Sequence, residues 1–140
     1  MKKNQNTAFS MIADYEGDIT KLFEDYSEEE ISILATRNLV LFPGVVSPIL
    51  IGRESSLKLI EKLHKKSNSI FAVFCQKDAS VEFPTKNDLY EYGVYARIIR
   101  VLEMPGNTNN VTVIVQGLGR CMLSDITKTK PHLKGHAIPA

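Results

Sequence analysis

The sequence lacks long apolar runs, and its net charge is close to zero. No stretch approaches the roughly 20 apolar residues that a membrane-spanning helix needs, and the charged first residues are followed by no apolar signal region. We therefore expect a cytoplasmic protein that does not enter membranes. The net charge of +1 over 140 residues creates no overall field that would attract nucleic acid or a membrane surface.

The sequence also has few residues that bind metals. Its two cysteines, Cys75 and Cys121, lie 46 positions apart in apolar runs, so we expect buried, reduced thiols. They show no paired-ligand spacing. His132 and His136 are four positions apart, but a proline and a glycine beside them disfavour the helix that would place both on one face. The sequence predicts no metal site.

Motifs of the common catalytic families are absent. A phosphate-binding loop needs a glycine-rich run that ends in Gly-Lys-Ser/Thr, and the nearest candidate, at Pro105–Asn107, lacks the lysine and resembles a hairpin tip. The Gly-x-Ser-x-Gly motif of serine hydrolases does not occur. We therefore expect neither catalytic residues nor a bound cofactor in this chain.

The composition is that of one ordinary globular domain, with 44% hydrophobic and 24% charged residues. The charge is uneven, because residues 1–33 contain eight acidic and three basic side chains. Apolar residues between Asp14 and Glu30 follow a helical spacing. We expect residues 1–32 to form an acidic leader, partly helical or disordered, that is either solvated or packed against a partner outside this chain.

From residue 33 onward the pattern predicts a mainly β domain. A strand-like run from Ile33 ends at Phe42-Pro43-Gly44-Val45, which is typical of a type II turn. Pro48 places the next strand, residues 45–51, at a sheet edge or a bulge, because proline cannot donate to a ladder. Residues 53–66 form the clearest helix. Further strands are expected at 70–75, 93–103, 111–126 with a bulge at Gly117–Gly119, and 132–138, with one helical turn at 88–92 and a hairpin tip at 104–110.

This chain resembles a known family, the amino-terminal domain of Lon ATP-dependent proteases, from about Ile33 to its end. The resemblance rests on short motifs in a fixed order, namely FPG at 42–44, GRE at 52–54, QKD at 76–78, DLY at 88–90, ARI at 96–98 and GLGR at 117–120. The family usually has Leu-Pro-Leu-Arg where this chain has Leu34-Ala35-Thr36-Arg37. The acidic leader is not a general feature of the family, so the resemblance implies no role for it.

The resemblance implies a PUA-like pseudo-barrel of about six mainly antiparallel strands around one main helix, over residues 33–140. It also implies a function, which is to recognise and recruit substrates for a protease that degrades misfolded and regulatory proteins. The parent would be a homohexameric serine endopeptidase that uses ATP and Mg²⁺. Its helical bundle, ATPase module and Ser-Lys peptidase module would lie outside this chain.

Capture of unfolded polypeptide needs exposed apolar surface, and two segments are candidates for it. The first is the turn with Phe42, Pro43, Val45 and Val46, which carries apolar residues where turns are usually polar. The alternative is that Phe42 and Val46 fold back onto the core. The second candidate, Phe83 with Pro84, interrupts a polar loop.

A function in another class stays open at this stage. PUA-like folds include RNA binders, so the chain could be an RNA-binding or stand-alone adaptor module. RNA recognition would need the basic residues on one surface beside stacking aromatics, for which Tyr90, Tyr92 and Tyr95 are candidates. Because Tyr90 and Tyr92 fit a core equally well, we consider nucleic acid a less favoured partner.

Overall fold

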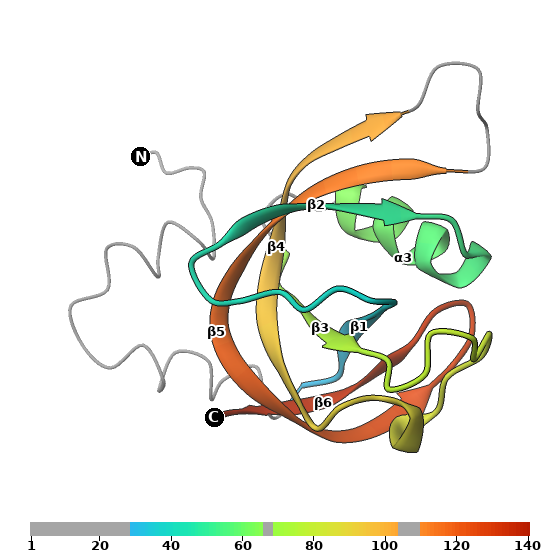
Figure 1. Ribbon diagram of the computed structural model, residues 1–140, viewed down its shortest axis with the longest axis vertical. Coiled ribbons are helices and arrows are strands. Elements are labelled where there is room, and N and C mark those ends of the chain that lie inside the picture. The colour runs from blue at the N-terminus through green and yellow to red at the C-terminus, as the bar shows by residue number, and fades with distance from the viewer. Residues whose placement is uncertain (1–28, 66–68, 104–109) are drawn as a thin grey trace.

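The computed structural model describes residues 29–65, 69–103 and 110–140 (Figure 1). Their elements are six strands, a helix and a short 3₁₀ turn. In chain order these are β1 (Ile31–Thr36), β2 (Val46–Ile51), α3 (Glu54–Lys65), β3 (Phe71–Cys75), the 3₁₀ turn (Lys86–Asp88), β4 (Tyr92–Glu103), β5 (Val111–Lys128) and β6 (Lys134–Pro139). Residues 1–28 of the predicted acidic leader (1–32) and residues 104–109 of the predicted hairpin tip (104–110) lie outside the described residues. The last two leader positions, Ile31 and Ser32, belong to β1.

The strands form one sheet that curls into a ring. Their order is β2-β5-β4-β3-β1-β6, and β5 also pairs with β6. The five strands from β5 to β6 therefore form a closed ring, and β2 pairs with β5 as an edge strand outside that ring. The β1–β3 pair is parallel, and the other pairs are antiparallel. The predicted mainly β fold with one main helix is confirmed, although the ring is not a regular barrel.

Two apolar cores fill the molecule, one on each face of the central strands. On β1, for example, Ile33 faces one core and Leu34 faces the other. This alternation follows from the two-residue period of a strand, and it explains why β3 is a continuous apolar run. Helix α3 covers the second core with Leu59, Ile60 and Leu63.

The predicted elements match the structure closely, with a few corrections. The expected strand from Ile33 to Phe42 begins at Ile31 and ends at Thr36. It stops there because Asn38 adopts a positive φ of 58° and the Thr36 hydroxyl donates to the Leu39 carbonyl at 2.7 Å. The expected helical turn at 88–92 lies earlier, at Lys86–Asp88.

The bulge in β5 is confirmed. Between Val94 and Ala96 the partner on β5 changes from Arg120 to Gly117, so three steps on β5 match two steps on β4. The extra residue bends β5 and lets this 18-residue strand pair with β2 and β4 in its first part and with β4 and β6 in its second.

Candidate functional site

The turn at residues 42–45 exposes its apolar side chains. Phe42 is 60% exposed, Val45 43% and Val46 53%, whereas the neighbouring Leu41 is buried. Pro43 is exposed as well. The alternative in which Phe42 and Val46 fold back onto the core is therefore wrong, because Leu41 supplies the core contact from this segment.

Backbone contacts hold this turn in place. Gly44 has a φ of 78° and the Val45 amide donates to the Phe42 carbonyl at 3.2 Å, as expected for a type II turn. The Gly44 amide donates to the Gly117 carbonyl, and the Gly117 amide donates to the Val45 carbonyl, both at 2.9 Å. A fixed backbone with exposed apolar side chains presents a surface at little conformational cost.

Glycine is required at position 117 by the close approach of the turn. A Cβ atom there would lie 2.2 Å from the Phe42 carbonyl oxygen. The sequence indicated this residue as part of a bulge, but nothing in the sequence showed that the bulge receives the turn. The β5 bulge therefore sets where the apolar turn sits on the surface.

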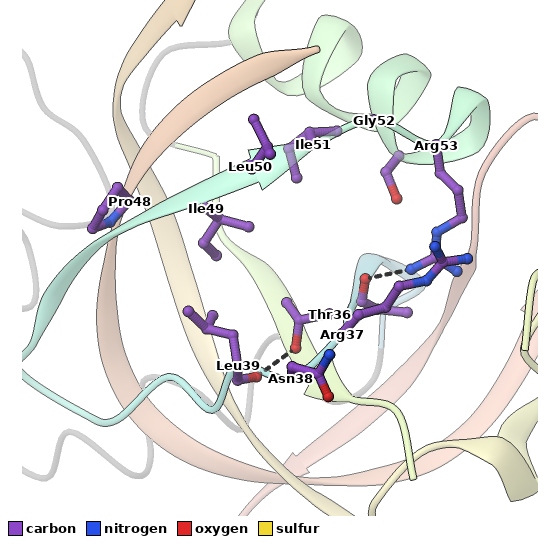
Figure 2. A pocket seen from close by; sticks show the side chains of 12 residues that line it. Thr36, Arg37, Asn38, Leu39, Pro48, Ile49, Leu50, Ile51, Gly52 and Arg53 are labelled. Atoms are coloured by element: carbon purple, nitrogen blue, oxygen red, sulfur yellow. Dashed lines mark hydrogen bonds between the residues drawn. The ribbon is translucent and has the colours of Figure 1, made fainter. Parts of the chain in front are cut away.

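The apolar surface continues from the turn along one side of β2. Val46, Pro48 and Leu50 alternate with the buried Ile49 and Ile51, and Leu50 is 65% exposed. Figure 2 shows Leu50 on the opposite side of β2 from Ile49 and Ile51. We name the exposed set Phe42, Val45, Val46, Pro48 and Leu50 the apolar strip. Leu50 was missed from sequence because its alternation with core residues was hidden in a continuous apolar run.

A groove of about 450 Å³ lies between β2 and the end of β1. We name it the β1–β2 groove. Its apolar walls come from Leu39, Ile49 and Leu50, among others, and two arginines, Arg37 and Arg53, line it together with uncharged polar groups. Figure 2 shows the two arginine side chains reaching toward one another. Among the residues that the structure describes, no carboxylate lines this groove.

Main-chain carbonyls hold both arginines. Arg53 donates from Nη2 to the Ala35 carbonyl at 3.0 Å and from Nη1 to the Glu82 carbonyl at 3.3 Å. Arg37 donates from Nη2 to the Val81 carbonyl at 3.4 Å. Burial lowers the pKa of Arg53 and the charge of Arg37 lowers it further, while the Glu82 carboxylate opposes this shift. The two like charges are therefore close enough to affect each other.

The second predicted segment, at Phe83 and Pro84, is only half exposed. Phe83 is 80% exposed, whereas Pro84 is buried. Both line a second hollow of about 820 Å³, which α3 and residues 129–133 also border. The turn residues line neither hollow. The structure thus keeps the two predicted segments apart, with Arg53 lining both hollows between them.

A buried histidine lines the second hollow. His132 is 2% exposed, its Nε2 lies 3.2 Å from the Ser32 hydroxyl, and its Nδ1 has no partner within the described part of the chain. Burial lowers its pKa, and the nearby charges of Lys62 and Lys134 lower it further. We therefore expect a neutral imidazole at pH 7, which supports a structural role.

The three tyrosines considered for RNA stacking divide into two groups. Tyr90 and Tyr92 are exposed, and the guanidinium of Arg120 lies 5.8 Å from the Tyr92 ring centroid. Tyr95 is fully buried and donates to the Ala137 carbonyl at 3.1 Å. The alternative that Tyr90 and Tyr92 belong to the core is wrong, because their side chains are 50% and 52% exposed.

Other reactive groups form no cluster in the described residues. Both cysteines are free, with Cys121 buried and Cys75 partly buried. Within residues 29–65, 69–103 and 110–140, no three His, Cys, Asp or Glu side chains gather as a metal site would require. No helix in this part of the chain is long and apolar enough to span a membrane.

Comparisons with known proteins converge on one family. The family model for the ATP-dependent protease La (LON) substrate-binding domain matches residues 30–139. Lon protease of Porphyromonas gingivalis is 53% identical over 115 residues, which cover 82% of this chain and 13% of that protein. Lon protease of Flavobacterium johnsoniae is 39% identical, over 86% of this chain and 15% of that protein. This chain thus spans only a small part of its relatives.

Solved structures show the same fold. The N-terminal domain of a Mycobacterium avium complex Lon protease superposes with a TM-score of 0.61 at 16% identity, over 80% of this chain and 55% of that one. A Lon N-terminal domain protein from Xanthomonas campestris gives a TM-score of 0.58 at 17% identity, over 80% of this chain and 60% of that one.

Proposed function

Because this chain belongs to the family of Lon substrate-binding domains, we propose that it recruits unfolded or misfolded polypeptide segments to a Lon-type protease through its apolar strip. The parent enzyme would be a homohexameric serine endopeptidase that uses ATP and Mg²⁺ in the cytoplasm. Its catalytic Ser-Lys pair and its nucleotide site would lie outside these 140 residues.

The observation that carries this proposal is the exposure of Phe42, Val46 and Leu50 on a hydrogen-bonded turn and the edge strand that follows it. Contiguous apolar side chains on a soluble domain mark surfaces that bind other polypeptides. Unfolded segments differ from folded proteins by the apolar side chains they expose, so such a surface selects them with little sequence specificity. Folded substrates would offer few matching contacts.

Each contact would be weak, and avidity would supply the strength. A single domain offers one narrow strip, whereas six copies in a ring would hold one long segment at several points. Phe83 adds a second apolar contact on the same domain. The parent's motor would then pull the captured segment inward.

Replacing Phe42 and Val45 with serine in the full-length protease tests this function. We expect the Michaelis constant for an unfolded substrate to rise about three- to tenfold, because each exposed apolar contact contributes modestly. The ATPase rate without substrate should stay unchanged. A matched control is Ile138→Ser, which removes a 38%-exposed apolar side chain from β6, a strand that does not pair with β2.

An unchanged Michaelis constant in a double variant that still folds would contradict this proposal. An equal rise in the Ile138 control would also contradict it, because the apolar strip would then have no special role.

A further inference from the structure

The open edge of β2 is a template for an additional strand. Within residues 29–65, 69–103 and 110–140, this strand pairs with β5 on one side and ends the sheet order on the other. An unpaired edge offers main-chain donors and acceptors that an extended peptide can use. Pro48 has no amide hydrogen and its nitrogen faces away from β5, so the open edge lacks one donor and an added strand pairs through the remaining outward groups of β2.

The β1–β2 groove runs beside this edge and ends at two positive charges. Figure 2 shows β2 on one side of the groove, residues 36–39 on the other, and the side chains of Arg37 and Arg53 at one end. In the described residues neither guanidinium forms an ion pair with a carboxylate; each contacts main-chain carbonyls. A guanidinium has five N–H donors, so each keeps donors for a ligand.

An anionic ligand would relieve the repulsion between the two arginines. A carboxylate accepts hydrogen bonds from guanidinium groups with matching geometry, and such pairs are stronger than neutral hydrogen bonds. The rest of the groove is lined by apolar residues such as Leu39, Ile49 and Ile51, which suit apolar side chains of a ligand. A ligand that satisfies the whole groove therefore combines an extended backbone, apolar side chains and one carboxylate.

We propose that the β1–β2 groove binds an extended, apolar polypeptide segment as an added strand on β2, with an Asp or Glu side chain of that segment between Arg37 and Arg53. This proposal rests on the recruitment function above and names the kind of segment that is recruited. It commits to an internal acidic side chain rather than a terminal carboxylate. The groove is bordered by exposed residues at both ends, Pro48 on one side and Arg37, Asn38 and Gly52 on the other, so a chain can continue past it.

Fluorescence anisotropy with labelled decapeptides tests the charge preference. One peptide alternates valine and threonine around a central glutamate, the matched peptide has glutamine at that position, and both have amidated carboxyl termini. The 140-residue chain should bind the glutamate peptide about three- to tenfold more tightly at low salt, as expected for a partly exposed ion pair. This preference should shrink at 0.5 M salt because salt screens exposed charges.

Variants of the chain locate the effect. Arg37→Gln and Arg53→Gln should each reduce the preference for glutamate, whereas Lys58→Gln, which removes a half-exposed charge from α3, should not. Arg53 also holds the loop at residue 82, so Arg37→Gln serves as the independent variant if Arg53→Gln lowers the melting temperature. Equal binding of both peptides to the wild-type chain, or a preference unaffected by both variants, would overturn the proposal.

Peptide N-methylation tests strand addition. In a bound strand, every second peptide amide faces β2. Methyl groups on these amides block the hydrogen bonds to β2, whereas methyl groups on the other amides point away from β2. We expect one set to abolish binding and the other to leave it intact. Equal binding of both sets would refute the added strand, and a preference seen only with a free terminal carboxylate would refute the internal acidic side chain. Recruitment through the apolar strip would survive either result, because the Phe42 and Val45 variants test it separately.

Discussion

Replacing Gly117 with alanine perturbs the position on β5 that is hydrogen-bonded to the apolar turn. The new Cβ would lie 2.2 Å from the carbonyl oxygen of Phe42 and 3.0 Å from its carbonyl carbon. Neither atom can move without moving the turn. The turn would move away from β5 and lengthen two hydrogen bonds that are both 2.9 Å long, from the Gly44 amide to the Gly117 carbonyl and from the Gly117 amide to the Val45 carbonyl.

The magnitude follows from these contacts. Overpacking against backbone costs about 1–3 kcal/mol, and each weakened hydrogen bond costs about 0.5–1.5 kcal/mol. When the turn moves to relieve the overlap, the hydrogen bonds weaken, so the two costs do not add in full. We expect the free energy of unfolding to fall by about 2–4 kcal/mol. For a domain of this size the melting temperature should fall by on the order of 10 °C.

Urea unfolding monitored by circular dichroism measures this change. The matched control is Gly52→Ala, whose Cβ would meet the Asn110 Oδ1 at 2.6 Å. That atom is the end of a flexible side chain, so the control should stay within about 1 kcal/mol of the wild type. A Gly117→Ala chain whose unfolding free energy equals that of the wild type would refute the inference that this glycine seats the turn.

Three further predictions concern buried polar groups. Burial raises the pKa of the Cys121 thiol to about 12, so iodoacetamide at pH 8 should modify Cys75 first and leave Cys121 intact in the native chain, as mass spectrometry will show. Burial lowers the pKa of His132 below its usual 6.5, so the unfolded chain binds a proton at this histidine more readily than the folded chain does. The free energy of unfolding should therefore fall as the pH drops below about 6.5. In urea titrations at pH 5–8, His132→Gln should make the free energy of unfolding less dependent on pH. Tyr95→Phe removes the buried hydroxyl that donates to Ala137, and calorimetry should show a loss of about 1–2 kcal/mol, whereas Tyr90→Phe, at an exposed position, should change little.

Local chemistry explains what could be predicted from sequence. The turn at Phe42–Val45 follows from proline and glycine at fixed positions, and the edge position of β2 follows from Pro48. Helix α3 follows from its apolar spacing, and the apolar residues Leu59, Ile60 and Leu63 are buried in the structure. These features depend on neighbours within a few residues.

Features that depend on distant contacts could not be predicted. Arg37 and Arg53 are 16 positions apart, and they meet because β1 and the start of α3 lie side by side. Pro84 is buried beside the exposed Phe83, in a loop that borders a cavity together with α3 and residues 129–133. Neither arrangement leaves a periodic signal in the sequence.

Amide chemical-shift mapping tests the central claim most directly. The isotope-labelled 140-residue chain is titrated with a permanently unfolded polypeptide, such as a reduced and carboxymethylated protein. We predict that the largest shifts occur at residues 40–50, over the turn and β2, and that they weaken in the Phe42 and Val45 serine variant. Shifts that cluster instead on the exposed face of α3, or that persist unchanged in the variant, would contradict capture by the apolar strip.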